Sequence, residues 1–168
     1  MMARIVMLAR NLTVMICLTA ASNLTAGTLV QPFYSIDFPD GWTYSIEPST
    51  GDNWSDLVTF RRADTDDHLK IISYHAPIAV TEERLRSMTN VDARIRLTWQ
   101  QWGDFAGYQY AYEEQGSYYL QWFLVNEKTL LLVTYQGDPI TKDSVTTDLA
   151  PMIRSLTTSP PANRVKVR

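Results

Sequence analysis

The chain has 168 residues, of which 45% are hydrophobic and 20% are charged, and its formal net charge is −3. This length and composition are typical of one globular domain with a single core and argue against a disordered chain. The single cysteine, Cys17, excludes a disulfide framework.

Residues 1–26 have the layout of a secretory signal. They contain two arginines and no acidic residue, and residues 12–21 form an apolar run that small and polar residues follow. A bilayer span takes roughly 20 residues, so this run is short for one. We therefore expect cleavage after Ser22 or Ala26 and a periplasmic or secreted protein. An uncleaved membrane anchor and a lipidated cysteine are the alternatives.

Without residues 1–26 the chain keeps 13 basic and 18 acidic residues, a net charge of −5. The remaining sequence has no concentrated basic stripe, which argues against a nucleic-acid partner. Contact with a membrane is expected only through an uncleaved signal.

The first half of the expected domain is rich in strands. Residues 33–38 and 42–47 alternate in polarity, and the Pro-Asp-Gly turn at 39–41 joins them. Residues 57–61 and 69–74 form a predicted hairpin around a polar turn.

A helical period then predicts a helix over about 81–102. Thr81 is a suitable N-cap. The four arginines of this segment fall outside the apolar stripe and are expected to be solvated. The stripe consists of Leu85, Met88, Val91, Ile95, Trp99 and Trp102.

Residues 108–112, 118–125 and 129–135 predict an antiparallel meander with short turns. One parity is expected to face the core, namely Tyr108, Tyr110, Tyr112, Tyr118, Leu120, Trp122 and Leu124. The opposite parity is more polar and includes Tyr119 and Gln121. A second helix is predicted over about 143–156, with Pro151 marking a kink or its start. Residues 157–168 are expected to form a disordered basic tail.

This order of elements resembles that of the PsbP family, the extrinsic subunit of photosystem II and its bacterial relatives. The resemblance is carried by Phe38-Pro39-Asp40-Gly41-Trp42, by Gly107-Tyr108 and by Ile153-Arg154-Ser155-Leu156, and it covers about residues 33–156. It implies an α+β fold: a single α/β/α sandwich over 27–156, with a central twisted antiparallel sheet and the two helices. It also implies an accessory or assembly role outside the cytoplasm without chemistry of its own.

The residues offer little for catalysis. No nucleophile motif, zinc-protease motif or phosphate-binding loop is present. The two histidines, His68 and His75, have opposite parity and are read as surface residues. The acidic group of Asp64, Asp66 and Asp67 is read as a solvated turn rather than a calcium loop. We therefore expect no cofactor, no metal and no enzymatic activity.

The aromatic residues provide the candidate sites. Trp54, Asp56 and Tyr119 are candidates for a protein interface, because exposed aromatics with polar neighbours suit one. Trp99, Trp102 and Tyr110 are candidates for the wall of a pocket between sheet and helix.

Three functions follow in order of preference. The first is an exported accessory protein that binds an unidentified protein partner, as an assembly factor or a toxin-immunity protein. The second is a carrier of a small ligand, which would use the aromatic pocket. The third is a hydrolase with a nonstandard site.

Overall fold

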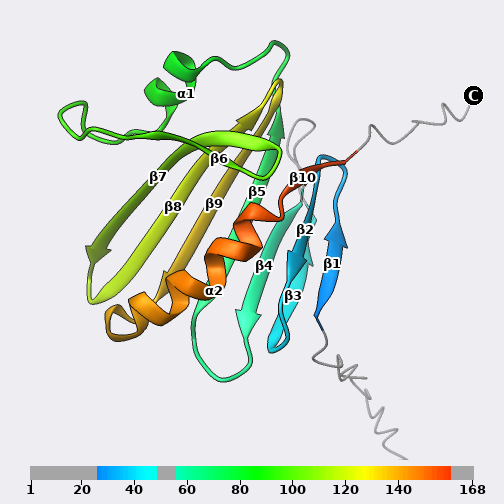
Figure 1. Ribbon diagram of the computed structural model, residues 1–168, viewed down its shortest axis with the longest axis vertical. Coiled ribbons are helices and arrows are strands. Elements are labelled where there is room, and N and C mark those ends of the chain that lie inside the picture. Colours follow the sequence, from blue (N-terminus) through cyan, green and yellow to red (C-terminus); the bar gives the residue numbers. More distant parts are fainter. Residues whose placement is uncertain (1–25, 49–55, 160–168) are drawn as a thin grey trace, which may run out of the picture.

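The computed structural model describes residues 26–48 and 56–159 (Figure 1). Its body is a seven-stranded antiparallel sheet with the order β3-β4-β5-β9-β8-β7-β6. The strands are β3 Trp42–Glu47, β4 Leu57–Arg62, β5 His68–His75, β6 Trp99–Trp102, β7 Phe105–Glu114, β8 Ser117–Asn126 and β9 Thr129–Gly137. The predicted hairpin (β4 and β5) and the predicted meander (β7, β8 and β9) are both confirmed.

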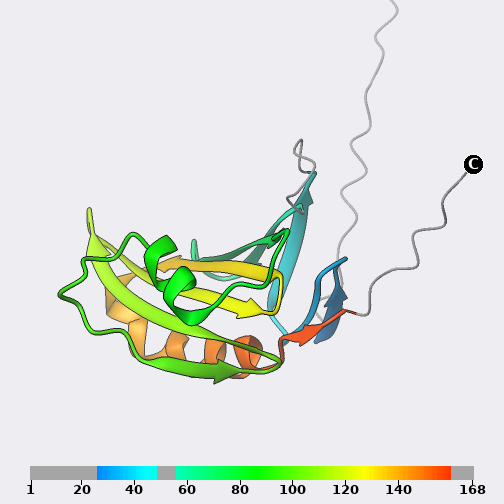
Figure 2. The ribbon, with the colours of Figure 1, turned by 90° about the horizontal axis from the view of Figure 1, so that it is seen from above.

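A small sheet and two helices complete the fold. The small sheet has the order β1-β2-β10, and its strands are β1 Gly27–Val30, β2 Tyr34–Phe38 and β10 Thr157–Thr158. The helices are α1 Glu82–Met88 and α2 Lys142–Arg154, and the 3-10 turn η1 Pro139–Thr141 precedes α2. Figures 1 and 2 show α2 lying across the large sheet, with β2 to one side and β6 to the other. The α+β class with a central antiparallel sheet is therefore confirmed.

A two-residue turn sets the register of β7 against β8. Gln115 and Gly116 have φ values of 49° and 80°, as the central pair of a type I′ hairpin requires. This turn pairs Tyr112 with Tyr119, so an even position of β7 faces an odd position of β8. The tyrosines of β7 therefore lie on the face opposite Leu120 and Trp122. The prediction that they share one core face is wrong.

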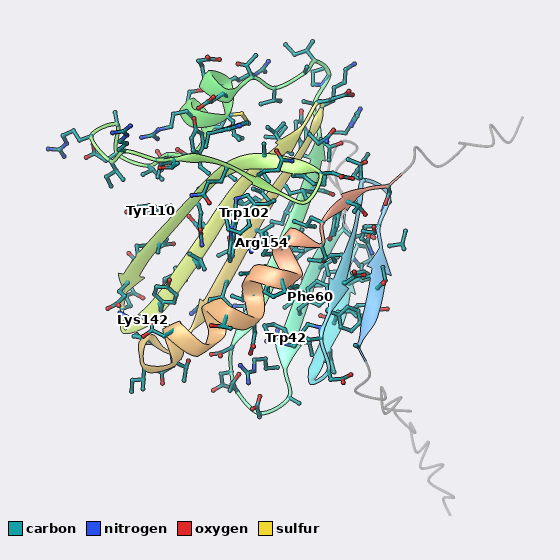
Figure 3. All side chains as sticks on the ribbon, viewed as in Figure 1. Trp42, Phe60, Trp102, Tyr110, Lys142 and Arg154 are labelled. Atoms are coloured by element: carbon teal, nitrogen blue, oxygen red, sulfur yellow. The ribbon has the colours of Figure 1, made fainter. Side chains whose placement is uncertain are left out.

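The main core lies between the large sheet and α2. The rings of Trp102 and Trp122 meet edge to face at 6.1 Å, and the Arg154 guanidinium lies 5.8 Å from the centre of the Trp102 ring (Figure 3). Each fully buried aliphatic side chain contributes roughly 1.5–3 kcal/mol. The second helix predicted over about 143–156 is confirmed, and Pro151 lies inside it on its exposed side. The buried apolar side chains in and just after α2 are Leu149, Met152, Ile153 and Leu156.

The first helix is much shorter than predicted. α1 ends at Met88, and Trp99 and Trp102 lie on the strand β6 instead of a helix. Asn90 has a φ of 53°, a left-handed conformation that a helix cannot continue through. The spacing of three between the two tryptophans resembles a helical period, but on a strand it places them on opposite faces.

The Arg86 side chain holds the segment that follows α1. Its Nη1 donates to Thr89 Oγ1 at 2.9 Å and to the Val91 carbonyl at 3.1 Å. Its Nη2 donates to the carbonyls of Asp92 at 3.1 Å and Ile95 at 3.0 Å. Arg86 is therefore half-buried and bonded, and not solvated as predicted.

Two other predictions concern the ends of the chain. Thr157 and Thr158, placed in the expected disordered tail, form β10 and pair with Ser35 and Tyr34 of β2. Residues 160–168 and the expected secretory signal up to residue 25 lie outside the described residues. In the described part of the chain, no helix is both long and apolar enough for a transmembrane span.

Candidate functional site: an aromatic sheet face and a pocket at its end

The face of the large sheet opposite α2 is only partly covered. α1 packs on it at one end of the strands, where the Tyr108 hydroxyl donates to Glu82 Oε1 at 3.1 Å. Burial, followed by this contact, raises the pKa of Tyr108. A second apolar cluster forms there from Ala76, Val80, Leu85, Tyr108 and Val125.

Beyond α1, three tyrosines form a continuous stack. The rings of Tyr110 and Tyr112 are 5.6 Å apart with an interplanar angle of 23°, and those of Tyr112 and Tyr119 are 4.9 Å apart at 9°. All three are half-buried. Burial, and then the nearby Glu114 carboxylate, raise the pKa of Tyr112. We call the surface around this stack the tyrosine face; it consists of Tyr110, Tyr112, Tyr119, Gln121, Phe123 and Leu132.

A groove of about 480 Å³ runs between the tyrosine face and the segment at residues 89–95. Leu132 at its floor is 36% exposed and Ile95 at its wall is 38% exposed. Arg86 holds this wall through three hydrogen bonds to backbone carbonyls and one to the Thr89 hydroxyl. The wall of the groove is therefore held in place by the charge-assisted hydrogen bonds of the Arg86 guanidinium and not by a helix.

The structure separates the residues predicted for an interface. Tyr119 lies on the tyrosine face, whereas Asp56 immediately precedes β4. Asp56 is near Tyr34, and its charge, after burial, raises the pKa of that tyrosine. Asp56 and Tyr119 are separated by three strand-to-strand spacings across the sheet and by about five residues along the strands, or roughly 20 Å. Trp54 lies outside the described residues.

The residues predicted for one pocket do not meet either. Trp102 points into the main core under α2. Trp99 packs edge to face on Tyr108 at 5.2 Å, on the other side of the sheet. Tyr110 alone lines the groove. The predicted pocket required a helix over residues 81–102, and its absence distributes the three side chains over two faces.

A pocket of about 420 Å³ lies at the end of the sheet away from α1, where the β4–β5 turn, the β7–β8 turn and η1 meet. We call it the end pocket; its polar lining includes Asp66, Asp67, His68, Ser117, Gln136 and Asp138. Among the described residues, no group of three or more His, Cys, Asp or Glu could hold a metal ion.

Asp67 in the end pocket is 4% exposed, so the prediction of a solvated acidic turn is wrong at this residue. Its Oδ1 accepts from the Asp138 amide at 3.4 Å, and its Oδ2 is shielded from solvent. Burial first, and then a side-chain hydrogen bond with Asp67, raise the pKa of Tyr135. A Cβ at Gly137 would lie 2.7 Å from Asp67 Oδ1, so only glycine leaves room there.

Sequence reasoning missed two residues of these sites. Arg86 falls outside the apolar stripe, and nothing in its spacing shows that it bonds to backbone carbonyls. Asp67 lies in a run of polar residues, but it directly precedes the strand β5, where the alternation of Leu69 and Ile71 assigns odd positions to the core face. That parity is a signal that could have indicated its burial.

Comparison with known proteins gives structural neighbours alone. No family model matches the chain, and no curated protein matches it. The cyanobacterial PsbP of Synechocystis (CyanoP) aligns with a TM-score of 0.60 and 14% identity over 83% of this chain and 96% of its own. The fold is PsbP-like. This confirms the resemblance seen in the sequence, and at this identity it shows the fold only.

Two further structures share the PsbP-like fold. LpqN, described as involved in cell envelope biogenesis of Mycobacterium tuberculosis, aligns with a TM-score of 0.50 and 13% identity over 81% of this chain and 91% of its own. A protein from Bacteroides thetaiotaomicron aligns with a TM-score of 0.56 and 13% identity over 82% of this chain. The chain spans about half the length of that protein, at 49%.

Proposed function

We propose that this chain is an exported, non-catalytic accessory protein that acts by binding another protein through its tyrosine face. The observation that carries the proposal is the stack of Tyr110, Tyr112 and Tyr119 on a sheet face that α1 leaves uncovered. Stacked tyrosines offer a large amphipathic contact area, and ordering them again on binding costs little side-chain entropy. Such residues are typical of the centre of protein interfaces.

Export and an envelope role have separate support. The basic start and short apolar run of residues 1–26 are typical of a secretory signal. LpqN, which shares the fold, is described as involved in cell envelope biogenesis. The non-catalytic part of the proposal rests on the lack of catalytic motifs in the sequence.

The test is affinity capture from the periplasm or culture medium with matched variants. We expect a stoichiometric partner to be retained by the unmodified protein and lost with Tyr112→Ser. Tyr44→Ser is the control, because Tyr44 is also a strand tyrosine, is 47% exposed, and lies on the other side of the sheet. A partner that Tyr112→Ser retains as well as Tyr44→Ser does would contradict the assignment of this face, and repeated failure to recover any partner would contradict the function.

The groove beside the tyrosine face favours a second function, the transport of a small ligand. Its volume of about 480 Å³ lies within the usual range for ligand sites, which is about 300–1,000 Å³. Native mass spectrometry of the mildly extracted protein should then show an added mass that Gln121→Trp removes by filling the groove. A spectrum of the unliganded mass alone would speak against a carrier.

A further inference from the structure

Two basic side chains lie on the same face of the large sheet as the tyrosine stack. Directly paired residues of an antiparallel sheet project to the same face. One row of such pairs runs across the sheet from β4 to β7 and consists of Arg61, His68, Gln136, Tyr119 and Tyr112. Arg61 therefore shares a row with the tyrosine stack, and Figure 1 shows the order of the strands that this row crosses.

A second row of paired residues runs beside the first. It joins Lys70 of β5 to Tyr110 of β7 through Thr134 and Gln121. Lys70 and Arg61 occupy diagonal positions on neighbouring strands, which places their Cβ atoms roughly 7 Å apart. We call this pair the basic end of the face. None of the residues in the two rows is buried, so the described part of the chain leaves the face accessible from the basic end to the tyrosine stack.

Both cations of the basic end are exposed and without a counter-charge. Arg61 and Lys70 form no ion pair with any residue that the structure describes. Arg62, the next residue of β4, projects to the opposite face and pairs there with Asp64 at 3.4 Å and Asp148 at 3.5 Å. Within the described residues, carboxylates thus balance the β4 cation on the α2 side and leave the two cations on the tyrosine side unbalanced.

The two ends of this face differ in charge. Glu114 is exposed at the end of β7 beside the tyrosine stack, and its charge, after burial, raises the pKa of Tyr112. A partner that covers charged side chains must present complementary charge, because like charges brought together at an interface cost binding energy. The carboxylates of a partner therefore fit the basic end and not the end of β7.

We propose that the protein partner presents an acidic segment, whose carboxylates pair with Arg61 and Lys70 while an aromatic or apolar side chain of the same segment packs on the tyrosine stack. This inference rests on the proposed protein-binding function and adds the chemistry of the partner. The tyrosine rings provide the apolar contact area, and the Arg61 guanidinium can bind a carboxylate through two parallel hydrogen bonds.

The register of the strands also sets the spacing within the partner segment. Arg61 and Tyr119 are three strand spacings apart, and so are Lys70 and Tyr110. Adjacent strands lie about 4.8 Å apart, so each cation is about 14 Å from the tyrosine of its row. An extended chain advances about 3.3 Å per residue, and we therefore expect about four residues between the apolar anchor and the first carboxylate.

A short peptide tests this inference without the partner. The acetylated and amidated peptide Trp-Ser-Ser-Ser-Glu-Glu, and the same peptide in reverse order, are titrated into the full chain and followed by NMR amide shifts. One of the two should cause saturable shifts at both ends of the face, in β4–β5 and in β7–β8. Glutamine in place of both glutamates should weaken binding about fivefold or more, as the loss of two exposed ion pairs implies. Salt at about 1 M should remove that difference, because the Debye length falls to about 3 Å.

Matched variants show whether the basic end is responsible. Arg61→Gln combined with Lys70→Gln should abolish the preference for the glutamate peptide. Arg84→Gln combined with Lys128→Gln is the control, because it removes the same charge from exposed positions on α1 and in the β8–β9 turn. The control should keep the preference, since neither of its positions lies in the two rows.

Several outcomes would overturn the inference: no saturable shifts, equal binding of the glutamate and glutamine peptides, shifts at one end of the face alone, or an equal loss in the control. Binding to vesicles of anionic phospholipid that requires Arg61 and Lys70, without peptide binding, would assign the basic end to a membrane and overturn it too. The two proposals fail separately. A captured partner that survives the change of Arg61 and Lys70 but not Tyr112→Ser refutes the acidic segment, whereas peptide binding without any captured partner refutes the protein-binding function.

Discussion

Replacing Arg86 with methionine should release the wall of the groove while leaving the sheet intact. Methionine keeps the length and the apolar stem of the side chain but removes its charged donors. The carbonyls of Val91 and Ile95 then lose their bond to Arg86, whereas Thr89 Oγ1 still accepts from the Val91 amide at 3.4 Å and the Asp92 carbonyl from the Ile95 amide at 2.9 Å. Because this segment lies on the surface and has no helix or strand structure, its order depends largely on the Arg86 side chain.

The magnitude follows from the four bonds. Net contributions of about 0.5–1 kcal/mol each, at the low end of the usual range because water can replace these bonds, give roughly 2–4 kcal/mol. This free energy opposes local opening of residues 89–98, so their amides should exchange with solvent about 30- to 1,000-fold faster in the variant. Global unfolding should change less, because the main core under α2 is not touched.

Hydrogen exchange followed by mass spectrometry on peptides covering residues 89–98 is the assay. Arg84→Met is the control, because Arg84 lies on the same helix and is exposed. Peptides from β8 report the global stability. If Arg86→Met accelerates exchange of residues 89–98 no more than Arg84→Met does, the network does not hold the groove and the reasoning fails.

Three further predictions concern stability and processing. Gly107→Ala should destabilise the protein by about 3 kcal/mol or more in urea denaturation, since its Cβ would lie 1.9 Å from the Phe123 carbonyl oxygen. The control Gly41→Ala should cost only about 1 kcal/mol, because its Cβ meets no atom within 4 Å and only the φ of 84° opposes it. Equal losses of stability in the two variants would refute the packing argument. Burial raises the pKa of Tyr135, so the unfolded chain ionises near pH 10 while the folded chain stays protonated. The free energy of unfolding should therefore fall above about pH 10 by about 1.4 kcal/mol per pH unit for this residue; Tyr135→Phe should lessen that slope, and an unchanged slope would contradict the assignment. N-terminal sequencing of the exported protein should show that about 22–26 residues have been removed, and an intact N-terminus would contradict a cleaved signal.

Much of the fold could be predicted because its signals are local. Strand-like runs separated by short polar turns predict β4, β5 and β7–β9, and the helical pattern of residues 143–156 predicts α2. The wrong prediction of a helix over residues 81–102 could not be corrected from the sequence alone. Its apolar spacing is compatible with a helix, and what ends it is a positive φ at Asn90 together with tertiary packing of Trp99 and Trp102 on two faces.

The candidate site was predictable only in part. Tyr119 was assigned to a surface by its polar neighbours, and the structure places it in the tyrosine stack. The stack itself depends on the register of β7 and β8, which the turn at Gln115 and Gly116 fixes. A one-residue difference in that turn would have placed the tyrosines of β7 with Leu120 and Trp122.

The sequence alone determined the class of fold, the expectation of export and the supply of aromatic side chains, because composition, period and the N-terminal pattern are properties of neighbouring residues. The tertiary structure decided which face each aromatic occupies and that Asp67 is buried. The sheet face that an aromatic side chain occupies depends on strand register, and the burial of Asp67 depends on segments that are distant in the chain. Asp67, Tyr135 and Asp138 meet only because the β4–β5 turn and the end of β9 lie at the same end of one sheet.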